Sequence, residues 1–540
     1  MIERVNQWDR QISISIAMLT VFAALLGYLQ ITAGNLNNQY RAESSRYAVD
    51  AMRLRSTGEA RSSFEAGHML RLAELITQQR ALAQSNEDTA TVQKLDAIAQ
   101  SLKSLSPVLN DPYASMKDGA VERYEVDAYL VDAVRAEQMR AAVTALDQAW
   151  DAKANTYVVH LTLIAVVLAL LGLSQAMANV PRLMVLVVSA LMTLLTIGWT
   201  ASTYLQPLPV LSKPAIDAYA TAYGAAYQSH REEALKGYDE ALKQLPTYAD
   251  AHYERGMTLW LLDSNEEALL ALSSARENGY DAASVDSMES YLLLTVGRVA
   301  DAEVSAQKWV EREPENRDAL GALLAAQIAH DQLEPAQATL KKLQGSATEA
   351  IRKQTETGSG VDDATIGELE MAADTLHSVV LSSQGDESVE IKNVKLSEGT
   401  VAAARDMVRA LRSQAMRAAF ALTSEPVGAM SEIVVGTLDE SEAFAAMDKI
   451  ASTVQSIALQ MKTDSVPADA HILVRIYQDG FENQALRYVT KWDGEPTGMK
   501  VLSVPIDIGA AYVLQTGMYE VEMYVNGVMQ GERVRFEVTE

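Results

Sequence analysis

Three uninterrupted apolar runs constrain the fold of this chain more than any other feature of its sequence. They cover residues 12–33, 157–178 and 181–204, and none of them contains Asp, Glu or Lys. A helix needs about 20 predominantly apolar residues to cross a hydrocarbon core of ~30 Å. The first run is longer than the apolar stretch of a signal peptide, and no clear small-x-small cleavage site follows it. The runs therefore predict three uncleaved membrane-spanning helices, with the lipid bilayer as the first partner of the chain.

The second and third runs are separated only by a short polar stretch, so we expect them to form a tight hairpin. Pro181 suits the first turn of the third helix, where its missing N–H costs no hydrogen bond. Trp199 and Tyr204 lie near the end of that helix, where amphipathic rings favour the membrane interface. His160, close to the start of the second run, we expect to be solvated at the interface. We therefore predict an N-terminal tail with the first span over residues 1–34, a hairpin of two spans over residues 157–204, and a linker over residues 205–214.

The negative charge of the chain is concentrated after the last apolar run. Of the 45 basic residues 17 precede residue 205 and 28 follow, whereas 19 of the 71 acidic residues precede it and 52 follow. Such an acidic body is repelled by nucleic acid, so we expect no nucleic-acid partner; plain solubility is the alternative reason for the charge. The chain has no cysteine, and residues 206–209 (QPLP) form a proline-containing exit from the third run. On these two grounds we expect an inside N-terminus and an extracytoplasmic C-terminal body.

Between the first two spans, residues 35–156 have the composition and periodicity of helix. Ala, Leu, Gln, Glu and Arg dominate, and apolar residues recur three and four positions apart. Breaks are expected at residues 85–88 and 107–119, where proline, glycine or polar clusters occur. The flanking parts run on into the spans and would rise about 70 Å from the membrane as a coiled-coil-like pair of helices. Because a single helical pair buries little apolar surface, we expect self-association into a homo-oligomer.

A period of 34 residues begins after residue 213. Four alanines repeat at this spacing, two prolines lie two periods apart, and a glycine and two further alanines occupy other small positions. These residues are Ala234, Ala268, Ala302, Ala336, Pro246, Pro314, Gly256, Ala241 and Ala275. The pattern resembles the tetratricopeptide repeat (TPR), in which small residues let two antiparallel helices approach closely and a proline ends the unit. The resemblance covers about residues 215–344, roughly a quarter of the chain, as about four repeats.

The third and fourth units depart from the TPR pattern. Tyr280 replaces the proline that ends the second unit, Trp309 occupies a usual small position, and Ser290 and Leu324 replace small residues of the first helix. TPR arrays stack into a superhelix with a concave groove, so the resemblance implies binding of a peptide, a helix or another subunit. A rigid spacer is the alternative. The candidate groove residues are Tyr219, Tyr223, Tyr227, His252 and Tyr253.

Residues 345–425 are predicted to be a polar linker with capping helices. Loops are expected at 358–360 and 382–386, and helices at 366–381 and 401–423. The second of these helices we expect to cap the repeat array, since a terminal repeat needs a covering element.

After residue 426 the sequence changes from helical to β patterning. The frequency of Ala falls and the frequencies of Val and Tyr rise. Asp479-Gly480 and Asn526-Gly527 are dipeptides typical of hairpin turns. Seven strands are expected, over residues 432–437, 454–462, 472–477, 486–492, 501–505, 519–525 and 534–538. The stretch 517–527 (GMYEVEMYVNG) resembles the immunoglobulin-like modules that end many bacterial surface proteins. The resemblance implies an antiparallel β-sandwich over residues 426–540 and a location in a bacterial cytoplasmic membrane.

The sequence contains no pattern that predicts catalysis, a cofactor or a metal ion. Its histidines are scattered without ligand spacing on one helix, and it has no Gly-x-Ser-x-Gly elbow. Residues 358–360 (GSG) lack the lysine and the following helix of a phosphate-binding loop. We therefore expect a protein that is not an enzyme.

The predicted fold class is multidomain and mainly α. It comprises three transmembrane helices with a long helical hairpin, a TPR α-solenoid and a C-terminal antiparallel β-sandwich. The expected function is a membrane-anchored scaffold that self-assembles and presents its TPR and β-sandwich domains for protein contact. The alternative is a monomeric membrane adaptor or receptor whose TPR groove captures a soluble protein or peptide.

Overall fold

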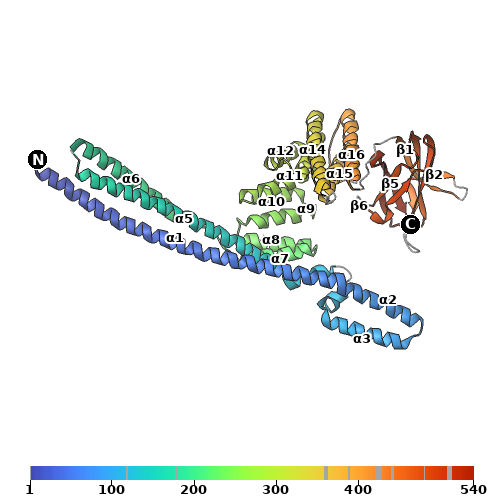
Figure 1. Ribbon diagram of the computed structural model, residues 1–540, viewed down its shortest axis with the longest axis horizontal. Helices are drawn as coiled ribbons and strands as arrows, with labels where there is room; N and C mark the ends of the chain where they lie inside the picture. Colours follow the sequence, from blue (N-terminus) through green and yellow to red (C-terminus); the bar gives the residue numbers. More distant parts are fainter. Residues whose placement is uncertain are drawn as a thin grey trace. The chain divides into compact units, whose positions relative to one another are not determined.

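The computed structural model describes residues 2–116, 119–177, 179–357, 363–386, 389–419, 428–439, 443–478, 481–506 and 514–539. The chain divides into two compact units, Met1–Asn278 and Gly279–Glu540. It is mostly helical, and its strands are confined to the C-terminal part, coloured orange to red in Figure 1. The division falls inside the predicted repeat array, so the two halves of the array belong to different units.

Two long helices form the stalk of the first unit. α1 (Ile2–Phe64) runs beside α5 (Val131–Gln175), as Figure 1 shows. Each helix turns an apolar stripe toward the other, and Leu26, Ile164 and Val167 have no exposed surface. Burial of apolar side chains on this scale supplies the main stabilisation of such a pair. The pair of long helices expected from the sequence is present.

Polar contacts hold the stalk helices together beyond the apolar runs. Asn37 donates to the backbone carbonyl and to the carboxylate of Asp147, at 3.1 and 2.7 Å.

The backbone of α1 comes close to the start of α5 at Gly58, because a Cβ atom there would lie 2.1 Å from the ring of Tyr129, just before α5. A larger residue at position 58 would therefore push the two helices apart.

A second hairpin forms the end of the stalk. α1 continues through a π-helical turn into α2 (Arg71–Ser85), which packs against α3 (Thr89–Leu105). The break between α2 and α3 lies where the sequence predicted it, and Asp88 caps α3 by accepting a hydrogen bond from the Thr91 N–H at 3.0 Å. The π-helical turn before α2 is Glu65–Leu70. The chain returns from α3 to α5 through short elements, which are Pro107–Leu109 and Tyr113–Ser115 (3-10), α4 (Ala120–Glu125) and Val126–Leu130 (π).

The third apolar run lies in α6 (Asn179–Leu205), which packs on α5. Lys153 on α5 donates to the Gln206 carbonyl at 2.8 Å and so fixes the end of α6. The expectation that His160 is solvated is wrong: α6 covers it completely. Its Nδ1 lies 3.1 Å from the hydroxyl oxygen of Thr200, and its ring meets Trp199 edge-on at 4.8 Å.

Pairs of short helices follow α6, and within each unit consecutive helices pack against each other. In the first unit they are α7 (Lys213–Tyr227), α8 (Arg231–Gln244), α9 (Ala249–Trp260) and α10 (Asn265–Glu277). In the second unit they are α11 (Ala282–Thr295), α12 (Val299–Arg312), α13 (Arg317–Ala329) and α14 (Leu333–Thr357). The second helix of each pair, α8, α10, α12 or α14, begins 34 residues after the previous one. The helix boundaries thus follow the period of the sequence.

The turn inside each helix pair also repeats. A residue with positive φ, between 58° and 77°, stands two positions before the second helix of every pair. These residues are Ser229, Asp263, Gly297 and Asp331, again 34 apart. The left-handed conformation ends the first helix and reverses the chain, and Gly, Asp and Asn adopt it at lower cost than other residues.

Two further helices extend the helical part of the second unit. α14 continues beyond the predicted end of the array, and Gly345 does not interrupt it, because Leu343 and Ala347 on either side are fully buried. α15 (Asp363–Ser383) packs on α13, and α16 (Glu398–Ala419) packs on α15 and α14. The loop expected at 358–360 and the end of the helix expected over 401–423 lie outside the described residues.

The C-terminal strands form two sheets with a common apolar core. One sheet has the order β2-β1-β4-β8, and the other has the order β3-β10-β9-β5-β6, with β7 also paired to β5. The core takes Ile457 and Leu459 from the first sheet and Ile472, Tyr519 and Phe536 from the second. The strands are β1 (Ala429–Leu438), β2 (Phe444–Ala446), β3 (Lys449–Ala451), β4 (Ser456–Asp464), β5 (His471–Gln478), β6 (Phe481–Glu482), β7 (Tyr488–Lys491), β8 (Gly498–Pro505), β9 (Gly517–Val525) and β10 (Val528–Thr539).

All seven strands expected from the sequence are present, and β2, β3 and β6 are additional. The turn between β9 and β10 is the predicted one: Asn526 and Gly527 both have positive φ, as a two-residue type I′ hairpin requires. Asp479-Gly480, the other predicted turn, lies outside the described residues, between the paired residues Gln478 and Phe481.

Candidate functional site

Large apolar side chains point outward along the three span helices of the first unit. Met18, Val21 and Leu194 are each about 70% exposed, at 69%, 71% and 69%. Contiguous apolar surface of this extent is unfavourable in water and marks a surface that another apolar phase covers. By length and composition all three helices can cross a membrane. The exposed apolar residues are Ile14, Met18, Val21, Leu25, Tyr28 and Ile31 on α1, Val158, Val159, Val166 and Leu173 on α5, and Leu183, Met184, Val187, Val188, Leu191, Leu194, Leu195 and Ile197 on α6.

The small residues singled out in the repeats lie at helix contacts. Gly256 on α9 faces α10, where a Cβ atom would lie 3.1 Å from Leu272 Cγ. Pro246 and Pro314 are exposed, each two residues after the end of a helix. The alanines have no exposed surface at all, and these are Ala234, Ala241, Ala268, Ala275, Ala302 and Ala336.

The tyrosines proposed for the groove face the stalk. Tyr219 on α7 is 4% exposed, with its ring 5.7 Å from Tyr238 and 5.2 Å from Tyr248, so it is a core residue. Tyr223 is half-buried beside it. Tyr227 is 44% exposed, and its hydroxyl donates to the Glu125 carboxylate. Because stalk residues share this core, the protein's own stalk occupies the tyrosine-bearing face of α7.

The remaining two candidate groove residues lie on α9 and are half-buried. His252 Nε2 is 2.8 Å from the Pro246 carbonyl oxygen, which ties α9 to the end of the preceding repeat. Tyr253 is the next residue on the same helix. Glu254 follows it, and burial together with the negative charge of Asp250 raises the pKa of Glu254 to about 7. Glu254 was not selected from the sequence, because the burial that raises its pKa depends on the packing of α9 and not on the residues next to it in the chain.

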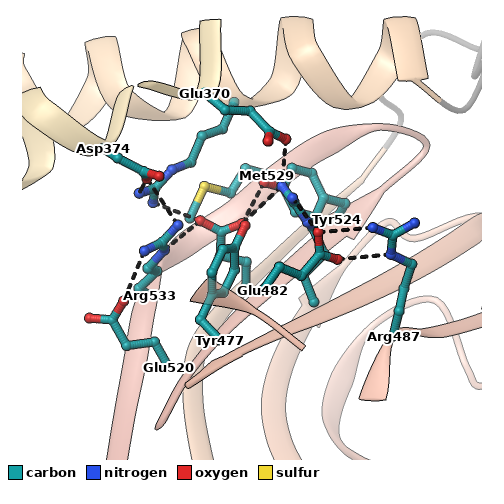
Figure 2. A network of polar contacts seen from close by, with 12 residues as sticks. Glu370, Asp374, Tyr477, Glu482, Arg487, Glu520, Tyr524, Met529 and Arg533 are labelled. Atoms are coloured by element: carbon teal, nitrogen blue, oxygen red, sulfur yellow. Dashed lines mark hydrogen bonds and ion pairs between the residues drawn. The ribbon is translucent and has the colours of Figure 1, made fainter. Parts of the chain in front are cut away.

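A buried network of ion pairs, shown in Figure 2, lies in the second unit where α16 packs on β10. Its centre is Glu522 on β9, which has no exposed surface. Glu522 Oε1 accepts a hydrogen bond from Arg533 Nε at 2.6 Å and lies 2.8 Å from Arg412 Nη1. Its Oε2 accepts hydrogen bonds from the hydroxyls of Tyr477 and Tyr524, at 2.7 and 2.8 Å.

Burial raises the pKa of Glu522, but the positive charges of Arg412, Arg533 and Arg475 outweigh it and hold that pKa well below its usual range. Arg475 Nη1 contributes at 3.7 Å from Oε2. The carboxylate is therefore ionised near pH 7, and its charge is one of those that compensate the three buried guanidinium groups.

The network extends from the strands to α15. Asp374 on α15 accepts from Arg412 at 2.6 Å and from Arg533 at 3.1 Å, and Glu370, one turn earlier, accepts from Arg475 at 2.9 Å. Two carboxylates on the strands also take part. Glu482 accepts hydrogen bonds from Arg475 and Arg487, and Glu520 accepts hydrogen bonds from Arg533 and Arg535. Each of these five arginines has a carboxylate partner. The network therefore acts as a cross-link between helices and sheet rather than as an open anion site.

A cleft of about 450 Å³ lies beside the network. His377 and Leu381 of α15 line it, with Met518, Glu520 and Arg535 from the strands. Burial and the positive charges of Arg412 and Arg533 lower the pKa of His377 to about 3, so this imidazole is neutral near pH 7. Among the described residues, no group of three or more His, Asp or Glu side chains is placed to hold a metal ion.

Comparison with known proteins gives no family for the chain. No family model matches it, and no curated protein matches it. Among solved structures, YrrB, a TPR protein with an unusual peptide-binding site, is 18% identical over 32% of this chain and 92% of its own, with a TM-score of 0.24. The alkylpurine DNA glycosylase AlkC of Pseudomonas fluorescens, bound to DNA containing an abasic site analog, is 11% identical over 60% of this chain and 87% of its own, with a TM-score of 0.21. At these TM-scores neither structure bears on what the chain does.

Proposed function

We propose that the chain is a membrane-anchored, non-catalytic scaffold that self-assembles and presents a TPR array and an immunoglobulin-like β-sandwich for protein contact. The observation that carries the proposal is the band of exposed apolar side chains on α1, α5 and α6. Three helices with this surface are stable together only if an apolar phase surrounds them, and a bilayer is the phase whose thickness matches about 20 residues of helix.

The proposed setting is a bacterial cytoplasmic membrane, with the C-terminal body on the extracytoplasmic side. Three spans place the N-terminus and the repeats on opposite faces of the bilayer. The absence of cysteine supports an oxidising compartment for the body. The resemblance of residues 517–527 to bacterial surface modules supports the same side.

Contact with other proteins is proposed for the repeats. Fully buried alanines at the helix contacts make each pair compact and leave the outer helix faces to bind a protein or peptide. The face of α7 that packs on the stalk is already occupied, so we place the partner site on other faces, where His252 and Tyr253 of α9 are half-exposed.

Self-assembly is proposed through the end of the stalk. Phe64, Leu72, Leu75 and Leu82 are 45–55% exposed, although they lie far beyond the apolar run of α1. Their spacings of eight, three and seven residues place them along one side of the continuous helix. Apolar side chains aligned in this way outside the bilayer favour packing against a second copy.

Mass measurement of the full chain in mild detergent tests the assembly. We expect a particle that is a defined multiple of the 58.7 kDa chain. The double substitution Leu75→Gln with Leu82→Gln should reduce it to monomer, whereas Leu261→Gln, at a 47%-exposed leucine of the repeats, should not. A wild-type monomer would refute self-assembly and favour the alternative function, a membrane adaptor whose repeats capture a soluble partner.

A further inference from the structure

An open groove lies between α1 and α6 in the membrane-spanning part of the first unit. Both helices pack on α5, and Leu171 of α5 lines the groove between them. The cavity measures about 610 Å³, within the roughly 300–1,000 Å³ usual for small-molecule sites. Its walls are formed by Trp8, Ser15 and Phe22 of α1 and by Leu186, Ser189 and Thr193 of α6.

The length of the groove matches one leaflet of a bilayer. From Trp8 to Phe22 the helix rises about 21 Å at ~1.5 Å per residue. Half of a ~30 Å hydrocarbon core is about 15 Å deep, and the first apolar run begins at Ile12. The groove therefore starts at the level of the lipid headgroups and ends near the middle of the bilayer.

Two buried polar atoms of α6 have no partner among the described residues. Arg182 is 9% exposed; its Nη2 pairs with Asp9 of α1, but its Nε is unpaired. Ser189, which lines the groove, is 1% exposed and its hydroxyl is unpaired. The two residues are seven positions apart, so they lie on one face of the helix about 10 Å from each other. Buried polar groups are normally satisfied, so this pair indicates a bound polar group.

We propose that the groove binds one zwitterionic glycerophospholipid of the surrounding membrane. The inference rests on the proposed membrane location. The lipid phosphate accepts a hydrogen bond from Arg182 Nε, an ester carbonyl accepts from the Ser189 hydroxyl, and one acyl chain fills the apolar groove as far as Phe22. Because Arg182 is already paired with Asp9, the ion pair at the polar end of the groove carries no net charge. A zwitterionic headgroup matches it better than an anionic one, with the lipid ammonium facing the Asp9 carboxylate.

A helix from a second copy is the competing occupant, since small and hydroxyl-bearing residues favour helix contacts in membranes. The ionic end of the groove argues against it. The apolar runs of this chain contain no Asp or Glu, and Asp9 of a second copy pairs with that copy's own Arg182, so it is not free to accept from Arg182 Nε. A phospholipid supplies an anion at the required depth, attached to an apolar chain of the required length.

Native mass spectrometry of the full chain in mild detergent tests the proposal, with phosphatidylethanolamine, phosphatidylcholine or phosphatidylglycerol added one at a time. We expect one lipid per chain and tighter retention of the two zwitterionic lipids. Ala190→Phe fills the groove from an exposed position, and Arg182→Gln removes the phosphate contact. Each should weaken lipid retention roughly tenfold, the effect of losing one charge-assisted hydrogen bond or its equivalent in apolar contact.

Two matched controls accompany these variants. Val188→Phe places the same phenyl ring at a 48%-exposed position that does not line the groove, and Arg10→Gln removes an exposed charge at the same end of α1. Both should retain lipid as the wild type does. Equal losses in Val188→Phe and Ala190→Phe, tighter binding of phosphatidylglycerol, or a lipid-free dimer that Ala190→Phe dissociates would each overturn the proposal. Extraction of the chain from membranes by alkali would instead overturn the membrane location itself.

Discussion

Replacement of Glu522 by Gln should strongly destabilise the junction between the helices and the sheet of the second unit. The substitution keeps the shape of the side chain and removes one negative charge. Arg533 at 2.6 Å and Arg412 at 2.8 Å then face a neutral amide, and Arg475 loses its contact at 3.7 Å. The amide oxygen can still accept from the two tyrosine hydroxyls, so the loss is mainly electrostatic.

The expected cost is about 3–5 kcal/mol, because removal of one partner from a buried ion pair leaves uncompensated charge. The arginines most affected, Arg412 and Arg533, have side chains only 2% and 5% exposed, so water cannot replace the lost carboxylate. Asp374 and Glu520 still pair with them, which places the cost nearer the lower end of the range.

Hydrogen exchange of the full chain in mild detergent measures this cost locally. Peptides from β9, β10 and α16 should lose protection in Glu522→Gln, whereas peptides from α1 and α5 should not change. The control is Glu532→Gln, at a carboxylate 52% exposed and 3.2 Å from Arg405, where a surface ion pair is worth about 0–1 kcal/mol. Equal effects of the two substitutions, both below about 1 kcal/mol, would refute the claim that the Glu522 charge holds this junction.

Three further outcomes are expected. Ser229→Gly should stabilise α7 and α8 by about 0.5–1 kcal/mol in hydrogen exchange, because Ser229 has a φ of 60° that glycine adopts without strain. Gly58→Ala should destabilise the stalk by about 1–3 kcal/mol in thermal unfolding, because its Cβ would meet the Tyr129 ring. The pKa of Glu254 is raised to about 7, so its ionisation removes stability as pH rises from about 4.5 through 7. Glu254→Gln should therefore raise protection of α9 at pH 8 by about 1–3 kcal/mol and leave it unchanged at pH 4, and the exposed-site control Glu277→Gln should change neither.

The helices of the stalk, of the apolar runs and of the repeats were predictable from the sequence because each depends on a local pattern. An apolar run of fixed length predicts a span whatever its neighbours are. The repeat period depends on small residues such as Ala234 and Ala268 that recur at the same helix contact. The left-handed residues of the turns, such as Ser229 and Asp263, share the period, but their side chains differ, so the pattern is visible only in the backbone.

The ends of elements were less predictable than their existence. The helical repeat array was predicted to end before Gly345, since glycine inside a helix costs about 1 kcal/mol relative to alanine. α14 runs on because burial of Leu343 and Ala347 offsets that cost. The strands β2, β3 and β6 have only two or three residues each, too few to show a period of two.

The buried network was not predicted, because residues from α15, α16 and four strands meet in it. One part of the network could have been expected from the sequence of a single hairpin. Glu520 and Glu522 alternate with apolar residues on β9, and Glu520 pairs in register with Arg535 on β10. Alternating acids opposite alternating arginines on a predicted hairpin indicate ion pairs on one face of the sheet. That α15 and α16 bury this face could not be read from the strands alone.

Labelling of single cysteines in sealed membrane vesicles tests the central claim most directly, because the natural chain has no cysteine. Cysteines would replace Asn86 at the end of the stalk, Lys243 in the repeats, Met177 between the second and third spans, and Leu25 within the first. With a membrane-impermeant maleimide, positions 86 and 243 should react from the same side, position 177 only from the other, and position 25 from neither. Reaction of all four positions from one side would contradict a body held at the bilayer by three spanning helices.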